Sequence, residues 1–85
     1  MIFATIKSPV FIDMLSFELV ATLACSICAI LRDDAGYECS RFEREVPEGN
    51  QVVTWRGLND LPYGVYTLEL QRGGEEMKMR MVKRV

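Results

Sequence analysis

The sequence of 85 residues contains no histidine and has little excess of charge of either sign. Histidine is the commonest general base and the commonest metal ligand, so its absence removes the usual basis of a catalytic or metal site. The formal net charge is −2 at pH 7, whereas a protein that binds duplex nucleic acid needs clustered cations. Nor does the chain show a nucleophile paired with a base. We therefore expect no enzymatic activity, no cofactor, no metal and no nucleic-acid partner.

The chain also lacks a hydrophobic run long enough to cross a bilayer. The longest apolar stretch covers residues 19–31 and contains two hydroxyl residues, whereas a spanning helix needs about 20 apolar residues. Residues 22–25 have a faint likeness to a lipoprotein cleavage site, but Asp13 and Glu18 lie where the apolar part of such a signal should be. We expect no transmembrane segment and no lipoprotein signal. The chain is then either a cytoplasmic protein or part of a longer secreted one.

Short segments with two-residue alternation of apolar and polar side chains make up most of the sequence. Gly, Pro or Asp separates them, as in small all-β domains. The segment 23–32 is apolar on both faces, which is typical of a strand in the middle of a sheet or under a covering loop or partner. The length suits one domain over residues 1–85. Seven strands are predicted, at residues 2–7, 14–20, 23–32, 37–43, 51–56, 66–70 and 77–81.

A helix over residues 11–32 is the alternative interpretation of the first half of the chain. Ala, Leu, Met and Glu in this segment all favour helices. The segment has no clear stripe of apolar residues at a 3.6-residue period, however, and it contains Thr, Ser and β-branched residues. One long helix here would also leave the later strands with too few partners. The strand interpretation is therefore preferred.

The last two predicted strands form the clearest pattern, a closing hairpin across Gly73 and Gly74. Three apolar residues alternate on each strand and are expected to face one another across the pair: Tyr66, Leu68 and Leu70 with Met77, Met79 and Met81. Methionine has a flexible side chain that fills irregular gaps in a core. We expect the methionines to lie in the core; if they were exposed, they would indicate a dimer interface.

The segment before this hairpin has the residues of a sandwich corner. Pro62 fixes φ and cannot donate to a ladder, so it belongs at the entrance of a strand. Gly64 permits a conformation that a side chain would oppose. Leu58 and Leu61 are expected to plug the open end of a sandwich, and the hydroxyl group of Tyr66 to bond to nearby backbone, as in a tyrosine corner.

Cys25 and Cys28 have the spacing of a redox or zinc motif, but residues three apart on a strand point to opposite faces. The thiols are therefore expected to be buried and reduced, and to act as small apolar side chains. A disulfide between Cys28 and Cys39 is the open alternative, because the turn at residues 33–36 brings their strands together. The simplest register would place Ile30, rather than Cys28, opposite Cys39.

The charged residues divide into a basic final strand and an acidic middle segment. The basic residues are expected to form a solvated outer face and to protect a sheet edge from aggregation; the alternative is docking to an acidic partner, an anionic surface or another protein's strand. The acidic residues Glu38, Glu43, Glu45 and Glu48 are expected to be solvated. The candidate partner-binding residues are Lys78, Arg80, Val82, Lys83 and Arg84.

Four elements in order carry a family resemblance: the turn at residues 33–36, the segment 53–55, the corner at 61–66 and the basic end at 82–84. Over residues 14–85 the chain resembles the immunoglobulin-like C-terminal sorting domain of type IX-secreted proteins. It is also similar to the related domain of flagellar hook-capping proteins. The resemblance implies an all-β, immunoglobulin-like sandwich of about seven antiparallel strands. The corner residues carrying it are Trp55, Gly57, Leu61, Pro62, Gly64 and Tyr66.

The resemblance also implies a function. The chain would be a non-catalytic module for secretion sorting or surface anchoring, with its C-terminal strand recognised by the export machinery. Its location would then be secreted or at the cell surface, and otherwise cytoplasmic. The alternative is a free-standing protein-interaction subunit that is able to form oligomers.

Overall fold

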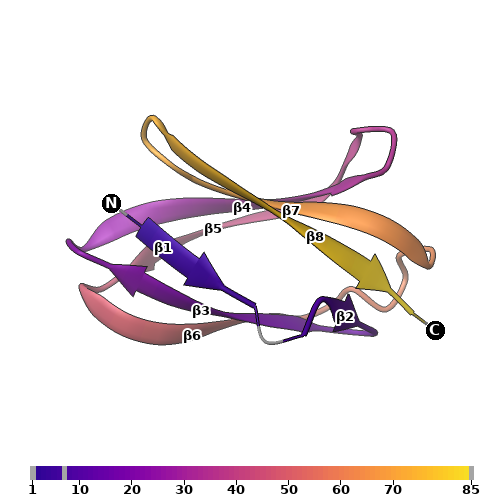
Figure 1. Cartoon of the computed structure of the whole chain (residues 1–85), viewed down its shortest axis with the longest axis horizontal. Helices are drawn as coiled ribbons and strands as arrows, with labels where there is room; N and C mark the ends of the chain where they lie inside the picture. The colour runs from indigo at the N-terminus through magenta and orange to yellow at the C-terminus, as the bar shows by residue number, and fades with distance from the viewer. Residues whose placement is uncertain (1, 7, 85) are drawn as a thin grey trace.

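The computed structural model describes residues 2–6 and 8–84, which form eight β-strands in two sheets (Figure 1). These residues form no helix, and so none with the length and apolarity that a membrane span requires. The strands are β1 (Ile2–Thr5), β2 (Val10–Phe11), β3 (Leu15–Ala21), β4 (Cys25–Asp33), β5 (Glu38–Val46), β6 (Gly49–Trp55), β7 (Gly64–Arg72) and β8 (Glu75–Lys83). The predicted all-β class is confirmed. The predicted first strand ran on to Lys7, which lies outside the described residues.

The two sheets lie face to face as a β-sandwich, with the order β1–β3–β6 in one and β2–β8–β7–β4–β5 in the other. One cluster of buried side chains fills the space between them, and it includes Phe17, Leu31 and Leu68. Every strand pair is antiparallel except β2 with β8, which is parallel. The prediction of seven antiparallel strands is therefore corrected to eight strands with one parallel pair. The strand that the sequence did not reveal, β2, has two residues, too few to show alternation.

Residues 15–33 form β3 and β4, so the helical interpretation of this region is wrong. Along β3 every second side chain is buried: Leu15, Phe17, Leu19 and Ala21. This two-residue period fits a sheet with one face in the core and would scatter the same side chains around a helix. Pairing with β1 on one side and β6 on the other satisfies the backbone of β3.

The apolar segment predicted for the middle of a sheet is β4, which pairs with both β5 and β7. It begins at Cys25, and Leu23 is exposed in the preceding turn. Ile27, Ala29 and Leu31 are buried between the sheets. Ile30 lies on the other face of β4 and is still only 2% exposed. The prediction of a two-faced central strand is confirmed.

The closing hairpin has the predicted pairing of β7 with β8: Tyr66 with Met81, Leu68 with Met79 and Leu70 with Met77. Met81 is fully buried, whereas Met77 and Met79 are half-buried against the core. The turn between the strands has Gly73 at φ +56°, a left-handed conformation that glycine adopts readily. The methionines therefore complete the core towards the hairpin tip.

The turn between β4 and β5 is organised by Asp33. Its carboxylate accepts hydrogen bonds from the backbone N–H groups of Ala35 and Tyr37, at 3.0 and 2.9 Å. A bulge follows, because Leu31 lies opposite Ser40 whereas Arg32 lies opposite Glu38. The predicted pairing of Ile30 with Cys39 is therefore wrong, and Ile30 lies opposite Arg41. The turn closes at Tyr37, and Cys39 is then the additional residue in β5.

Candidate functional site

The corner between β6 and β7 is fixed by three hydrogen bonds. The N–H group of Leu58 donates to the carbonyl oxygen of Asp13 at 2.9 Å, and that of Leu61 donates to the carbonyl of Leu58 at 3.2 Å. The hydroxyl group of Tyr66 donates to the carbonyl oxygen of Pro62 at 2.6 Å, the backbone bond expected of a tyrosine corner. Leu58 is buried and Leu61 half-buried, as expected for residues that plug the end of the sandwich.

The other corner residues also have structural roles. Trp55 is buried and packs edge-on against Phe42 at a centroid distance of 4.7 Å, so it joins the two sheets. Gly57 and Gly64 have φ values of +81° and +150°, which other residues rarely adopt. Burial is the main cause that raises the pKa of Tyr66, so its hydroxyl stays protonated and able to donate.

We expect Tyr66→Phe to lower the free energy of unfolding by about 1 kcal/mol, because the bond to Pro62 is lost while the ring is kept. Urea denaturation followed by circular dichroism measures this loss. Tyr63→Phe is the matched control, because the Tyr63 side chain is exposed and its hydroxyl can bond to water. Equal stabilities of the two variants would contradict the assigned role of the Tyr66 hydroxyl.

The five candidate partner-binding residues do not share one environment. Lys78, Arg80 and Arg84 are exposed and Val82 is half-buried. Lys83 is only 4% exposed, and its Nζ donates to the carbonyl oxygen of Arg84 at 2.9 Å. Alternation along β8 places residue 83 on the same face as Met81, towards the interior. The expectation that Lys83 belongs to a solvated face is therefore wrong, and its ammonium group is not available to a partner.

An apolar row crosses the outer face of the five-stranded sheet near the end of β8. Val10 of β2 is in register with Val82 of β8, which is in register with Val65 of β7. Val10 and Val65 are 41% and 43% exposed, and Tyr63 beside them is 75% exposed. A shallow recess runs between Tyr63, Val65, Val82 and Arg84. We name the group Val10, Tyr63, Val65, Val82 and Arg84 the C-terminal patch.

The backbone of β8 is already paired where the C-terminal patch lies. The N–H groups of Val82 and Arg84 donate to the carbonyl oxygens of Pro9 and Phe11, at 2.7 and 2.8 Å. β7 pairs with β8 along its other side. A partner at this end therefore meets side chains, and addition of a strand to the last residues of β8 would require β2 to leave.

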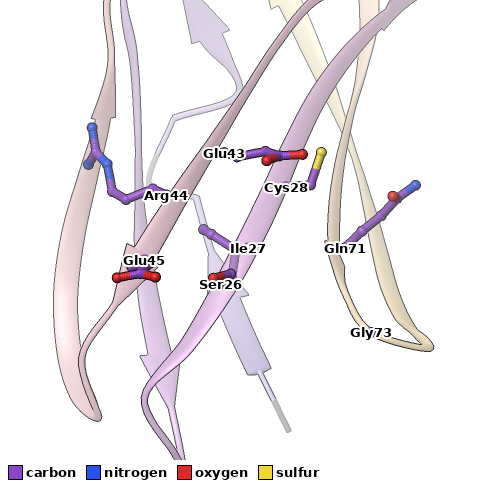
Figure 2. Close-up of a pocket in the computed structure, with 8 residues that line it drawn as sticks. All are labelled: Ser26, Ile27, Cys28, Glu43, Arg44, Glu45, Gln71 and Gly73. Atoms are coloured by element: carbon purple, nitrogen blue, oxygen red, sulfur yellow. The ribbon is translucent and has the colours of Figure 1, made fainter.

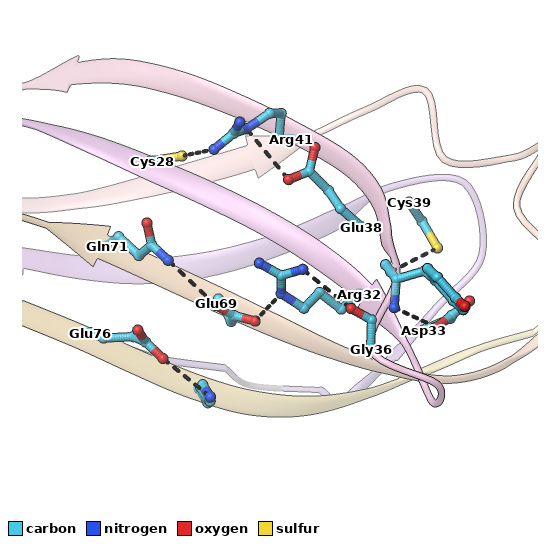
Figure 3. Close-up of polar contacts among 12 residues, drawn as sticks. Cys28, Arg32, Asp33, Gly36, Glu38, Cys39, Arg41, Glu69, Gln71 and Glu76 are labelled. Atoms are coloured by element: carbon cyan, nitrogen blue, oxygen red, sulfur yellow. Dashed lines mark hydrogen bonds and ion pairs between the residues drawn. The ribbon is translucent and has the colours of Figure 1, made fainter.

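A polar network lies on the outer face of the same sheet (Figure 3), where Glu69 of β7 is in register with the buried Ile30 of β4. Arg32 forms an ion pair with Glu69, which is only 5% exposed, and also donates to the carbonyl oxygen of Gly36 at 3.2 Å. Gln71 donates to Glu69 at 3.4 Å. Sequence reasoning missed this network, although an acidic residue on the strand beside an apolar central strand was the available signal. Beside Ile30, the outer face of the sheet thus has long polar side chains that are paired with one another.

The three cysteines are free, so the alternative of a Cys28–Cys39 disulfide is not realised. None of the three side chains is fully buried, so the expectation of buried thiols is wrong. Cys28 lies opposite Glu43, four residues along β5 from Cys39. Its sulfur accepts a hydrogen bond from Arg41 at 3.4 Å, on the outer face, whereas Cys25 packs against the core. The expected opposite orientation of Cys25 and Cys28 is confirmed. Burial is the main cause that raises the pKa of Cys39, which disfavours the reactive thiolate.

An open depression of about 440 Å³ lies between β4, β5 and the β7–β8 turn (Figure 2). Ser26, Cys28, Glu43 and Gln71 line it with polar atoms. Figure 2 shows Glu43 on the side of Cys28 and Arg44 directed away from it, as alternation along β5 requires. The acidic residues Glu38, Glu43, Glu45 and Glu48 are exposed, as predicted.

Within residues 2–6 and 8–84, no three or more His, Cys, Asp or Glu side chains are placed to hold a metal ion. At the end of the sheet, Val10, Val82 and Val65 are adjacent apolar side chains, with Arg84 beside them. Comparison with models of known protein families and with curated proteins finds no match for this chain.

Proposed function

We propose that this protein is a non-catalytic, immunoglobulin-like module that docks onto another protein through the C-terminal patch. The observation that carries the proposal is the row Val10–Val82–Val65, three apolar residues in register on the outer face of the sheet, of which Val10 and Val65 are exposed and Val82 is half-buried. A contiguous apolar group with a polar rim is typical of a protein-interaction surface.

The immunoglobulin-like topology is supported by the path of the chain between the sheets. After β3 the chain passes from the three-stranded to the five-stranded sheet, returns between β5 and β6, and passes to the five-stranded sheet again between β6 and β7. β4, β7 and β8 then lie together in one sheet, like strands C, F and G of an immunoglobulin domain. Tyr66 at the beginning of β7 corresponds to the tyrosine corner at the start of strand F.

The charges around the C-terminal patch indicate the chemistry of the partner. Arg84 lies in the recess itself, and Arg80 precedes Val82 on the outer face of β8. Lys78, further along that face, is 3.2 Å from Glu76 and so is partly compensated. We therefore propose a partner surface with an apolar centre and an acidic rim, since complementary charge sets orientation and raises association rates.

The specific role that we propose is sorting or anchoring at the cell surface, with the C-terminal strand as the element recognised. It is supported by the resemblance to type IX sorting domains and by the position of the exposed patch at the C-terminal strand. The alternative is a free-standing interaction subunit, which would bind its partner through the same surface but would not direct secretion. A transport experiment separates the two.

Residues 1–85, fused behind a reporter in a type IX-competent cell, are expected to deliver it to the surface. The triple variant Tyr63→Ser, Val65→Thr, Arg84→Glu should reduce delivery about tenfold or more, because it removes central contacts of the patch. Protease-accessible reporter on intact cells measures delivery. Point variants are preferable to removing residues 82–85, because that deletion also removes the pairing of β8 with β2.

The matched control makes the same three kinds of change at exposed residues elsewhere: Tyr37→Ser, Val52→Thr and Arg56→Glu. This control should be delivered like the wild type. Retention of the wild-type fusion inside the cell rejects the sorting role. Equal delivery by the patch variant and the wild type rejects the C-terminal patch as the recognised surface.

A further inference from the structure

β5 is an open edge of the five-stranded sheet. Over its nine residues it pairs only with β4, and no strand among the described residues lies on its other side. Such an edge presents unpaired backbone N–H and C=O groups that can continue the sheet with another chain. The opposite end of the sheet differs, because β2 covers Val82 and Lys83 there.

The charges along β5 alternate in sign rather than repeating one sign. Arg41 and Glu43 are exposed and adjacent on the outer face, two residues apart. Two copies of β5 that pair antiparallel about Phe42 would place Arg41 of each copy opposite Glu43 of the other. Opposite charges in directly facing positions stabilise a strand pair, and like charges destabilise it.

Other registers of the same two strands are less favourable. The central residue of such a pair lies opposite the same residue of the other copy. A charged central residue therefore faces a like charge, which excludes centres at Arg41, Glu43, Arg44 and Glu45. Centring the pair on Ser40 or Val46 shortens the overlap and loses the two Arg–Glu pairs. Only the pairing about Phe42 combines opposite charges with an uncharged centre, so the sequence of β5 selects one register.

On the inner side of β5, a recess beside Phe42 can accept side chains of the facing strand. Phe42 is half-buried, with the guanidinium group of Arg44 over its ring at 5.3 Å and the ring of Trp55 packed edge-on at a centroid distance of 4.7 Å. The recess beside these residues lies between the edges of β5 and β6, lined also by Thr54 and Arg56. In the pairing about Phe42, the second copy's phenyl ring meets the first at this recess and extends the aromatic group.

We infer that two copies of this chain associate through β5, antiparallel about Phe42, to give a continuous sheet across the dimer. The occupant is a second copy because the charge pattern complements itself. This interface is separate from the C-terminal patch, since β5 and the strands β2, β8 and β7 that carry the patch lie towards opposite ends of the sheet order. The inference therefore does not depend on the proposed function.

Two other sheet edges, β6 and the uncovered part of β8, are less suited to pairing with a second copy of the chain. β6 contains no charged residue to select a register. The uncovered part of β8 also contains an acid and a base two residues apart, but Glu76 and Lys78 already form an ion pair within the chain at 3.2 Å. Arg41 has a longer ion-pair contact, 3.8 Å with Glu38, and its other described polar contact is a hydrogen bond to the sulfur of Cys28 at 3.4 Å (Figure 3). Among these edges, the charged residues of β5 are thus the best placed to form ion pairs with a second copy of the chain.

The test is sedimentation equilibrium of the whole chain, from micromolar to millimolar concentration. The wild type is expected to dimerise, and added salt should weaken the dimer because the Arg–Glu pairs are exposed. Arg41→Glu and Glu43→Arg should each raise the dissociation constant about tenfold or more, because each converts two attractive pairs into two repulsive ones. The double variant Arg41→Glu, Glu43→Arg should restore dimerisation.

Circular dichroism first establishes that each variant is folded, which is expected because both residues are exposed. The patch variant Tyr63→Ser, Val65→Thr, Arg84→Glu should dimerise like the wild type. A wild type that stays monomeric at millimolar concentration overturns the inference. So does a dimer insensitive to both single changes, one that the double change does not restore, or one lost only in the patch variant.

Discussion

Replacing Leu31 by alanine is expected to lower the free energy of unfolding by about 3 kcal/mol. Leu31 is fully buried on β4, an interior strand of the five-stranded sheet, between Ser40 and Leu68 in the ladder. The truncation removes apolar contacts and leaves a cavity that neighbouring strands on both sides cannot easily close. Small domains have total stabilities of roughly 5–15 kcal/mol, so this single change removes a large share.

Urea denaturation measures the effect, and the fluorescence of Trp55, the one tryptophan in the sequence, reports it. Leu23→Ala is the matched control, since it is the same substitution at a side chain that is 61% exposed. We expect this control to change stability by less than about 0.5 kcal/mol. A similar loss in the two variants would contradict the placement of Leu31 at the centre of the core.

Arg32→Met is expected to lower the free energy of unfolding by about 2 kcal/mol, because it leaves the carboxylate of Glu69 buried without its cation. This loss of stability is smaller than for a fully buried ion pair, because Arg32 is half-buried and partly screened by solvent. Gln71 keeps its hydrogen bond to Glu69 in this variant and offsets part of the loss.

The double variant Arg32→Met, Glu69→Met should recover most of that stability. Two apolar side chains above Ile30 replace the ion pair without leaving a buried charge, and such replacements are often close to neutral. Thermal and urea denaturation of the wild type, both single variants and the double variant give the coupling energy. A double variant as unstable as Arg32→Met alone would show that the buried carboxylate is not the cause.

The parts of the fold that sequence reasoning recovered have local signals. The pairing of Tyr66 with Met81 follows from alternation on two strands joined by a tight glycine turn. The central position of β4 follows from apolar residues on both its faces. In each case the residues that form the pattern lie in one continuous segment, so the strand and its position can be predicted from the local sequence.

The parts that sequence reasoning missed depend on contacts between distant segments or on backbone details. β2 has two residues and is defined by its partner, β8, rather than by its own pattern. The register of β5 depends on where the turn closes and on one additional residue, Cys39, and neither leaves a compositional signal. A change of one residue in register moves every facing pair.

The candidate site shows the same division. The hydrogen bond of Tyr66 to Pro62 could be anticipated because both residues lie in one corner. Val10 could not be assigned to the C-terminal patch, because only the parallel pairing brings it beside Val82. The prediction for Lys83 is wrong because residue 83 lies two positions after the buried Met81 and so shares its inward face of β8, although a lysine is usually exposed.

The pairing of β2 with β8 has a consequence for biosynthesis. Val10 and Phe11 are synthesised well before their partners Val82 and Lys83, because the rest of the domain lies between them in the sequence. The β4–β5 hairpin joins neighbouring segments and is free to form early during translation, whereas this edge of the larger sheet stays open until residues 82 and 83 have been made. Until then the aromatic ring of Phe11 lacks its contact with a completed sheet, and the open edge of β8 is exposed to aggregation.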